Sequence, residues 1–237
     1  MNRLQNRRRI IGTAICAVLG SLAAFRVRAQ GRLDALSNTD ATAGLRAALE
    51  QGAQAAIGRL GRPDGFLKDA ALRIPLPPSL QKIETALRFA GMQAQADQLV
   101  VSMNRAAESA VPLAKPLMQN AIRGMSVADA KKILSGGDTS VTEFFKAKTA
   151  SPLTEKFIPI VKRETDKVGL AQQYNGLASQ AAAFGLVSEA DANIERYVTR
   201  RALDGLYTVV GEEERAIRQD PLKYGGSILS KVFGALR

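Results

Sequence analysis

The sequence predicts an all-α protein, a compact bundle of about eight to ten helices, several of them kinked, with no substantial sheet. Apolar residues recur every three or four positions over long stretches, which is the spacing of one helix face. These stretches begin near Ser, Thr, Asn or Asp and end near Gly, as helices usually do. No segment combines strict alternation of apolar and polar residues with β-branched enrichment, which a half-buried strand would need.

The first 29 residues have the features of an export signal rather than of a folded element. Arg7-Arg8-Arg9 precedes an apolar run, residues 10–25, and Val27 and Ala29 are the small residues that a signal peptidase accepts before a cut. We therefore expect residues 1–29 to be cleaved and the rest of the chain to be exported to the periplasm. The run is too short to span a bilayer comfortably, so we expect no transmembrane segment after cleavage.

Two export routes are compatible with this signal. Residues 6–11 fit the twin-arginine pattern, and Arg26 and Arg28, close to the cut, would hinder the general secretory route. An ordinary secretory signal also begins with a basic cluster, so the sequence leaves both routes open.

The composition of the exported part excludes several classes of function. The chain holds no histidine, no tryptophan and one cysteine, Cys16, which lies within the signal. Without Cys and His the exported part lacks disulfides, the usual ligands of zinc, haem and iron-sulfur clusters, and the usual base of a catalytic triad. We therefore expect no metal and no cofactor.

The charge pattern argues against nucleic acid as a partner. Removal of residues 1–29, with six arginines and no acids, lowers the formal net charge from +11 to +5. The remaining charges alternate in sign, as on a solvated helix surface, and form no basic stripe with interleaved aromatics.

Residues 30–237 are predicted to form a single all-helical domain. A capping cluster at residues 37–40 precedes the first helix, and Gly61 ends it. Its apolar stripe consists of Leu45, Leu49, Gly52, Ala56 and Leu60. The Pro-rich segment 62–78 follows, where prolines favour extended backbone over helix. This irregular segment either wraps the core or offers a strap for binding.

Two helices are expected next. The first covers about Leu80 to Ala90 and closes at Gly91, and the second covers about Gln93 to Arg123. Pro112 and Pro116 lie inside the second helix and should kink or divide it, because a proline cannot donate to the carbonyl one turn earlier.

The segments that follow are shorter, and glycine, serine or proline marks where each predicted helix begins or ends. Residues 126–129 open a short helix that Gly136-Gly137 ends, and Asp138, Thr139 or Ser140 caps the next one. Ser151-Pro152 is predicted to start a further helix, with serine as its cap and proline at its first position, and Pro159 marks a kink before Gly169 ends it.

Three further helices complete the prediction. They are residues 170–183, residues 191–219 and the amphipathic residues 227–237. The last of these could contact a membrane lipid or a partner helix, or it could dock on the core of its own chain.

Two local motifs suggest chemistry but have simpler explanations. Ser79-Leu80-Gln81-Lys82 matches the Ser-x-x-Lys of penicillin-binding enzymes, yet that fold needs a sheet that this chain does not supply. The acids of Glu212-Glu213-Glu214 point in different directions on a helix, and an ion pair of Glu213 or Glu214 with Arg218 is the expected role.

Several short motifs resemble, in order, a known bacterial family. They are Ile74-Pro75-Leu76-Pro77, Met103 to Glu108, Ile133 to Asp138, Phe157 to Val161, Tyr174-Asn175, Tyr197 to Leu206, Glu212-Glu213, Ile217 to Pro221, and Lys231 to Gly234. The family is domain of unknown function 4197, and the resemblance spans roughly residues 33–234. It implies an exported helical envelope protein and brings no activity, cofactor or catalytic residue.

The polar members of these motifs are the candidate ligand- or partner-binding residues. They are Asn104, Arg105, Asp138, Tyr174, Asn175 and Arg218. If they converge, they offer donors and one carboxylate to a polar or anionic ligand. Otherwise they serve as caps and buried polar clamps between helices. We assign no catalytic residue and no metal ligand.

Two classes of function follow from the sequence. The first is a non-catalytic binding or scaffold module of the cell envelope for a partner protein, a lipid or a small ligand, with residues 227–237 as the contact to an envelope protein or lipid. The second is a hydrolase or transferase that uses Asp, Glu, Lys or Tyr. It requires a cleft in which Arg105, Asp138, Tyr174 or Arg218 approach one another.

Overall fold

The computed structural model describes residues 38–220, apart from residues 83, 184–187, 189–190 and 192. Every regular element in this part is a helix and no strand occurs in it, so the all-α prediction is confirmed. The predicted signal peptide 1–29 and the predicted C-terminal helix 227–237 lie outside the described residues. Among the described helices, none is both long and apolar enough to cross a membrane.

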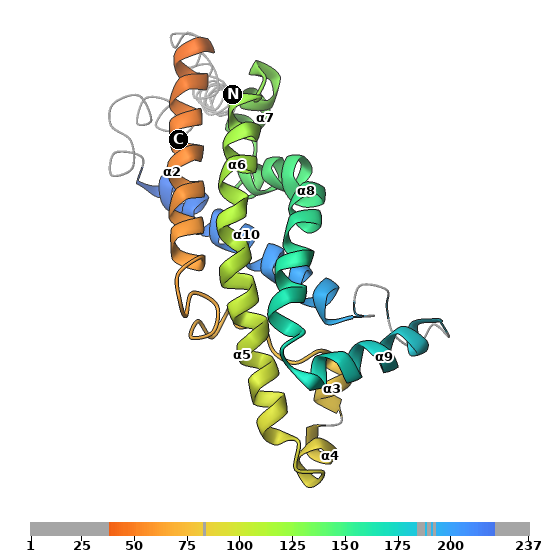
Figure 1. Cartoon of the computed structure of the whole chain (residues 1–237). Coiled ribbons are helices and arrows are strands. Elements are labelled where there is room, and N and C mark those ends of the chain that lie inside the picture. The colour runs from red at the N-terminus through yellow and green to blue at the C-terminus, as the bar shows by residue number, and fades with distance from the viewer. Residues whose placement is uncertain (1–37, 83, 184–187, 189–190, 192, 221–237) are drawn as a thin grey trace, which may run out of the picture.

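Three rods of helix form one layer of the fold. The central rod consists of α5 (Gln93–Ala110), the 3₁₀-helix η1 (Val111–Leu113) and α6 (Ala114–Arg123), which run end to end (Figure 1). On one side α2 (Asn38–Leu60) contacts α6, and on the other α8 (Ser140–Thr165) contacts both α5 and α6.

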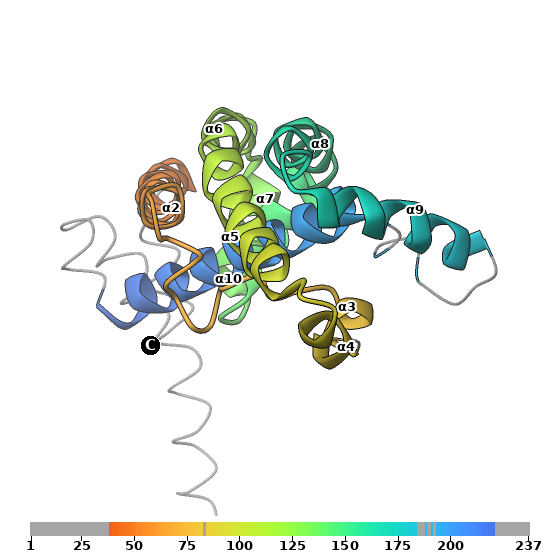
Figure 2. The same ribbon diagram turned by 60° about the horizontal axis from the view of Figure 1, so that its bottom comes forward.

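The helix α10 (Ile194–Gln219) crosses this layer and contacts α8, α2 and α5. Figure 2 shows it passing beneath the three rods. The predicted apolar stripe of α10 is fully buried at Val198, Ala202, Leu206 and Val209. The core therefore lies between α10 and the layer, because this is where the apolar faces of all four rods meet.

Four shorter helices complete the described structure. They are α3 (Pro78–Lys82), α4 (Glu84–Phe89), α7 (Val127–Ser135) and α9 (Gly169–Ala183). The helix predicted over 80–90 is described as α3 and α4, one on each side of residue 83. The predicted start of α7 is confirmed, since Ser126 and Asp129 form a reciprocal capping box.

Pro112 and Pro116 divide the long helix, as predicted. Pro112 lies in η1, and Pro116 is the third residue of α6. Pro116 lies in the first turn of a helix, where a proline loses no intrahelical hydrogen bond. At Pro112, which cannot donate a backbone hydrogen bond, the chain forms a tighter 3₁₀ turn instead of an α-helical one. Both segments stay aligned because each packs against α8.

The predicted start of a new helix at Ser151-Pro152 is wrong. The helix α8 continues from Ser140 to Thr165 with Pro152 and Pro159 inside it. An interior proline costs about 3 kcal/mol through its missing hydrogen bond and its ring clash. Fully buried side chains next to these prolines, Leu153 and Phe157, offset that cost. The helix therefore bends (Figure 1) but does not end.

The Pro-rich segment wraps the core. Residues 61–77 contain turns and extended backbone but no helix. Phe66 and Ile74 are completely buried, and Leu72 and Leu76 are each 7% exposed. Of the two expectations for this segment, packing on the core is therefore the one that the structure supports.

Candidate functional site

Asn104 on α5 clamps the Pro-rich segment. Its Oδ1 accepts the backbone N–H of Ile74 at 2.9 Å, and its Nδ2 donates to the carbonyl of the same residue at 2.9 Å. The Nδ2 also donates to the carbonyl of Val100 at 2.8 Å. Asn104 is completely buried. Its amide therefore replaces the partner that extended backbone would find in a sheet.

The neighbouring Arg105 joins a network that fixes the preceding turn. Its guanidinium contacts Asp64 and Glu108, both at 2.7 Å. The buried Glu108 also accepts the backbone N–H groups of Phe66 and Leu67 at 3.0 and 3.1 Å. Hydrogen bonds from Lys68 and then Arg105 lower the pKa of Asp64, so its carboxylate stays charged. The turn is thus held by charge-assisted hydrogen bonds.

The hydroxyl of Tyr174 also forms hydrogen bonds within the protein. Its hydroxyl donates to the carbonyl of Asp191 at 2.7 Å and accepts from the Ser79 hydroxyl at 3.2 Å. Burial raises the pKa of Tyr174. Ser79, the serine of the Ser-x-x-Lys motif, therefore binds a tyrosine of another helix.

Asn175 joins α9 to the start of α10. Its Oδ1 accepts the backbone N–H of Ile194 at 2.8 Å, and its Nδ2 donates to the carboxylate of Glu195 at 3.0 Å. Glu195 is 6% exposed and lies in the first turn of α10. The helix dipole favours an anion at that position, and the amide of Asn175 supplies it with a donor.

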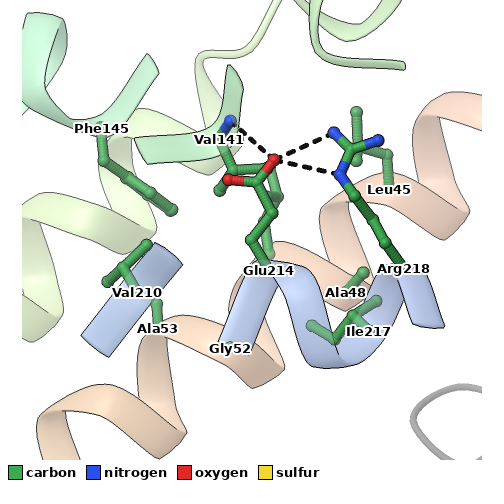
Figure 3. Close-up of a pocket in the computed structure, with 11 residues that line it drawn as sticks. Leu45, Ala48, Gly52, Ala53, Val141, Phe145, Val210, Glu214, Ile217 and Arg218 are labelled. Atoms are coloured by element: carbon green, nitrogen blue, oxygen red, sulfur yellow. Dashed lines mark hydrogen bonds and ion pairs between the residues drawn. The ribbon is translucent and has the colours of Figure 1, made fainter. Parts of the chain in front are cut away.

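Arg218 forms the predicted ion pair, with Glu214 one turn earlier on α10. The two side chains are 15% and 2% exposed, and Arg218 Nη2 lies 2.9 Å from Glu214 Oε1 (Figure 3). The same guanidinium nitrogen donates to the carbonyl of Ile133 at 3.1 Å and to the hydroxyl of Ser140 at 2.8 Å. Arg218 therefore ties α10 to the end of α7 and the start of α8.

Glu214 caps α8 from outside that helix. Its carboxylate oxygens accept the backbone N–H groups of Val141 at 3.2 Å and Thr142 at 3.3 Å. The predicted cap at residues 138–140 is only partly right, because Thr139 holds the N-cap position but makes no capping hydrogen bond through its side chain. The free N–H groups of a helix start attract an anion, and α10 provides it.

The hollow beside this ion pair is almost filled. Its walls come from α2, α8 and α10, and they are mainly apolar (Figure 3). The lining residues are Leu45, Ala48, Leu49, Gly52, Ala53, Val141, Phe145, Val210, Glu214, Ile217 and Arg218. Its volume of about 20 Å³ holds little more than one water molecule. We therefore regard it as a packing seam rather than a ligand pocket.

The six candidate residues do not gather into one site. Arg105 borders a hollow near Pro112, Arg218 borders the seam on α10, and Tyr174 lies between α9 and α3. Asp138 is exposed in the turn before α8. Neither of these hollows, nor the groove described next, is lined by more than one of these four residues, so none of them is the cleft that the hydrolase or transferase hypothesis requires.

A wider groove lies between α8 and α10. It has a volume of about 610 Å³, within the range of small-ligand sites. From α8 it is lined by Lys146, Ala150, Thr154 and Ile158, and from α10 by Arg196, Thr199, Arg200, Leu203, Asp204 and Tyr207. The walls thus combine apolar surface with three cations and a single carboxylate.

The cations of the groove differ in their partners. Arg200 pairs with Asp191 and lies over the ring of Tyr197. The ammonium of Lys146 lies 5.7 Å from the ring centroid of Tyr207, within the range of a cation–π interaction. Lys146 and Arg196 form no ion pair with any carboxylate of the described residues. Both side chains are exposed to solvent, so the groove carries two cations that form no ion pair within the described residues.

Thr199, in the wall of the groove, has an unsatisfied hydroxyl. The residue is 1% exposed, and its Oγ1 makes no hydrogen bond within the described part of the chain. A buried hydroxyl without a partner costs about 1–3 kcal/mol. The buried Thr165 of α8, in contrast, donates to the carbonyl of Val161 at 3.0 Å. The Thr199 hydroxyl oxygen is thus enclosed by the protein rather than open to the groove.

Sequence reasoning missed this groove. Its α8 residues recur every fourth position from Lys146 to Ile158, and its α10 residues lie one turn apart from Arg196 to Tyr207. These spacings mark one face of each helix, but they do not reveal that the two faces meet. Within the described residues, no group of three acidic, His or Cys side chains could hold a metal ion.

The comparisons with known proteins identify the family. No curated protein and no solved structure matches the chain. The sequence pattern of the family described as "Protein of unknown function (DUF4197)" matches residues 35–234. This range covers most of the chain, including all six candidate residues and the groove, and it confirms the resemblance of the short motifs. The chain belongs to the DUF4197 family of proteins of unknown function.

Proposed function

We propose that this protein is exported to the cell envelope and acts there as a non-catalytic binding module, with the groove between α8 and α10 as its ligand site. Export rests on residues 1–29, whose basic start, apolar run and small residues before a cut are typical of a signal peptide.

The observation that carries the binding function is the groove itself. It has the volume of a small-ligand site, and its walls offer apolar surface together with two unpaired cations. The polar residues first considered as a site are engaged in internal hydrogen bonds, with the exception of the exposed Asp138. The groove does bring together a lysine, an acid and a tyrosine, Lys146, Asp204 and Tyr207. The Tyr207 hydroxyl, however, is hydrogen-bonded to Thr149, and Lys146 and Asp204 are exposed to solvent, so we favour binding over hydrolysis or group transfer.

The walls of the groove are held in a fixed relation, which suits recognition. The hydroxyls of Thr149 on α8 and Tyr207 on α10 are 2.8 Å apart and hydrogen-bonded in the core. Glu214 of α10 caps the start of α8. A site whose walls are already in place loses less entropy on binding than one that must be ordered.

Native mass spectrometry of the protein purified from the envelope fraction of the exporting cell tests this proposal. We expect a chain that lacks residues 1–29 and carries a bound small molecule. The variant Ala150→Phe, which fills the groove from a half-buried position on α8, should lose the bound mass. An uncleaved chain confined to the cytosol would refute export. Absence of bound mass, or its retention in Ala150→Phe, would refute the groove as the binding site.

A further inference from the structure

The net charge of the exported part is concentrated in two short segments. Residues 123–132 hold three cations and one acid, and residues 221–237 hold three cations and no acid. Together they account for the whole formal charge of +5 that remains without residues 1–29, and the rest of the exported part is neutral. Such a separation of charge favours contact with an anionic surface at the place where the two segments meet.

The first of these segments includes most of α7, whose two lysines are exposed to solvent. Lys131 and Lys132 form no ion pair within the described residues. The acid of the segment, Asp129, belongs to the capping box, where its carboxylate accepts the backbone N–H of Ser126 at 3.0 Å and the hydroxyl of Ser126 at 2.8 Å. Val127, one turn before Lys131, is 49% exposed. An apolar side chain and a cation therefore lie side by side on the exposed face of α7.

The second segment leaves the described structure beside α7. Arg218, on the last turn of α10, donates to the carbonyl of Ile133 at 3.1 Å, and Asp220, where the described part ends, is two residues further on. Residues 221–237 therefore begin close to the end of α7 that carries the two lysines. The family pattern continues to residue 234, so this segment belongs to the domain that the family shares.

The sequence of the second segment is that of a basic amphipathic helix. Residues 227–237 are predicted to be amphipathic, and their charged side chains, Lys231 and Arg237, are both basic. The apolar face consists of Ile228, Leu229, Val232, Phe233 and Leu236. Helices of this kind lie in the plane of a bilayer interface, with the apolar face toward the acyl chains and the cations at anionic headgroups.

We propose that α7 and residues 221–237 together form a docking surface for an anionic phospholipid membrane. Lys131, Lys132 and the cations of residues 221–237 approach the headgroups, while Val127 and the apolar face of residues 227–237 enter the interface. Lysine suits this role, because its flexible, strongly hydrated ammonium binds a fluid layer of headgroups without a fixed geometry.

This docking surface is separate from the proposed ligand site. The groove between α8 and α10 is lined by no residue of α7, so the protein can rest on a membrane while the groove stays open. The membrane contact therefore does not rest on ligand binding, and a failure of one leaves the other unaffected.

Sedimentation of the signal-cleaved protein with lipid vesicles tests the class of partner. One set of vesicles is pure phosphatidylcholine, and the other is a mixture of phosphatidylcholine with the anionic phosphatidylglycerol. We expect binding to the anionic vesicles to be about tenfold or more tighter, and to be lost in about 1 M salt, where the Debye length is about 3 Å. Equal binding to both sets would overturn the anionic preference. Binding to neither set would overturn the membrane as the partner and favour a protein at this surface.

A pair of double variants tests the contribution of α7. Lys131→Gln combined with Lys132→Gln should weaken binding to anionic vesicles about tenfold or more, because each basic residue near an anionic surface contributes about fivefold. Lys115→Gln combined with Lys156→Gln removes the same charge from exposed positions on α6 and α8 and should change binding less than about twofold. Equal weakening in the two double variants would overturn α7 as the point of contact.

A substitution in the full-length exported chain tests residues 227–237. Phe233→Asp should weaken vesicle binding about tenfold or more, because a carboxylate opposes entry into the apolar side of an anionic interface, and it should leave the Tm unchanged. Unchanged vesicle binding would overturn the role of this segment. A lower Tm would show that residues 227–237 dock on the core of their own chain, and it would equally overturn their place at the membrane.

Discussion

The side chain of Asn104 holds the backbone of Ile74 by two hydrogen bonds, each 2.9 Å long, one to the N–H and one to the carbonyl. Both residues are completely buried. The extended, Pro-rich segment has no neighbouring strand in the described structure. The side-chain amide on α5 therefore supplies the hydrogen-bond donor and acceptor that a neighbouring strand would supply in a sheet. This clamp keeps irregular backbone inside a helical core without orphaned polar groups.

Asn104→Ala should destabilise the protein by about 2–4 kcal/mol, because it leaves the N–H and C=O of Ile74 buried without partners, at about 1–3 kcal/mol each. Urea unfolding followed by circular dichroism measures this change. Asn120→Ala is the control at an exposed position on α6 and should cost less than about 0.5 kcal/mol. Equal losses in the two variants would mean that the clamp does not hold the segment.

Glu214→Ala should be far more damaging than Glu212→Ala. The side chain of Glu214 is 2% exposed, and its loss leaves the Arg218 guanidinium without its carboxylate and the start of α8 without its cap. Removing one partner of a buried pair costs about 3–5 kcal/mol. Glu212 also pairs with an arginine, Arg59, but it is 40% exposed, so its loss should cost at most about 1 kcal/mol. Chemical denaturation of both variants checks the difference, and similar losses would contradict it.

Gly205→Ala should destabilise the protein, although alanine is the better helix former. A Cβ at this position on α10 would lie 2.7 Å from Cε1 of the fully buried Phe66. The resulting overpacking costs about 1–3 kcal/mol and outweighs the gain in helix propensity of about 1 kcal/mol.

Gly176→Ala provides the matched control for this substitution. It lies inside α9, and a Cβ there would meet nothing within 4 Å, so we expect a gain of about 0.5–1 kcal/mol. Thermal unfolding of the two variants should therefore shift the Tm in opposite directions. A gain in both would show that Phe66 moves aside without cost.

Alkaline pH should destabilise the fold through its tyrosines. Burial raises the pKa of Tyr174, Tyr197 and Tyr207 above the ordinary value near 10. Each therefore contributes stability that is fully present below pH 10 and is lost as the pH rises from 10 through the raised pKa of the folded state, because the unfolded chain ionises first.

The ultraviolet absorbance of phenolate, measured together with circular dichroism, checks this pH dependence. At least three of the four tyrosines of the chain should ionise above pH 10, and their ionisation should coincide with loss of helix. If all four ionise near pH 10 while the helices persist, these rings are not buried as the structure describes.

The sequence predicted the structural features that depend on residues close together in the chain. The apolar stripe of α10, the capping box at Ser126 and the division of the central rod by Pro112 and Pro116 all follow from the residues concerned and their near neighbours. The pair of Glu214 and Arg218 was predictable for the same reason, since residues four apart meet on one helix face. The family could also be identified from the order of short motifs.

By itself, then, the sequence determined an all-α protein and the positions of most of its helices, because helix periodicity and capping act within a few residues. Only the tertiary structure decided that α8 passes through Pro152, that Glu214 caps a helix 73 residues earlier in the chain and that Asn104 clamps Ile74. It also decided that Lys146, Arg196 and Thr199 share one groove. These relationships join residues far apart in the chain, and the free energy that fixes them comes from burial between helices.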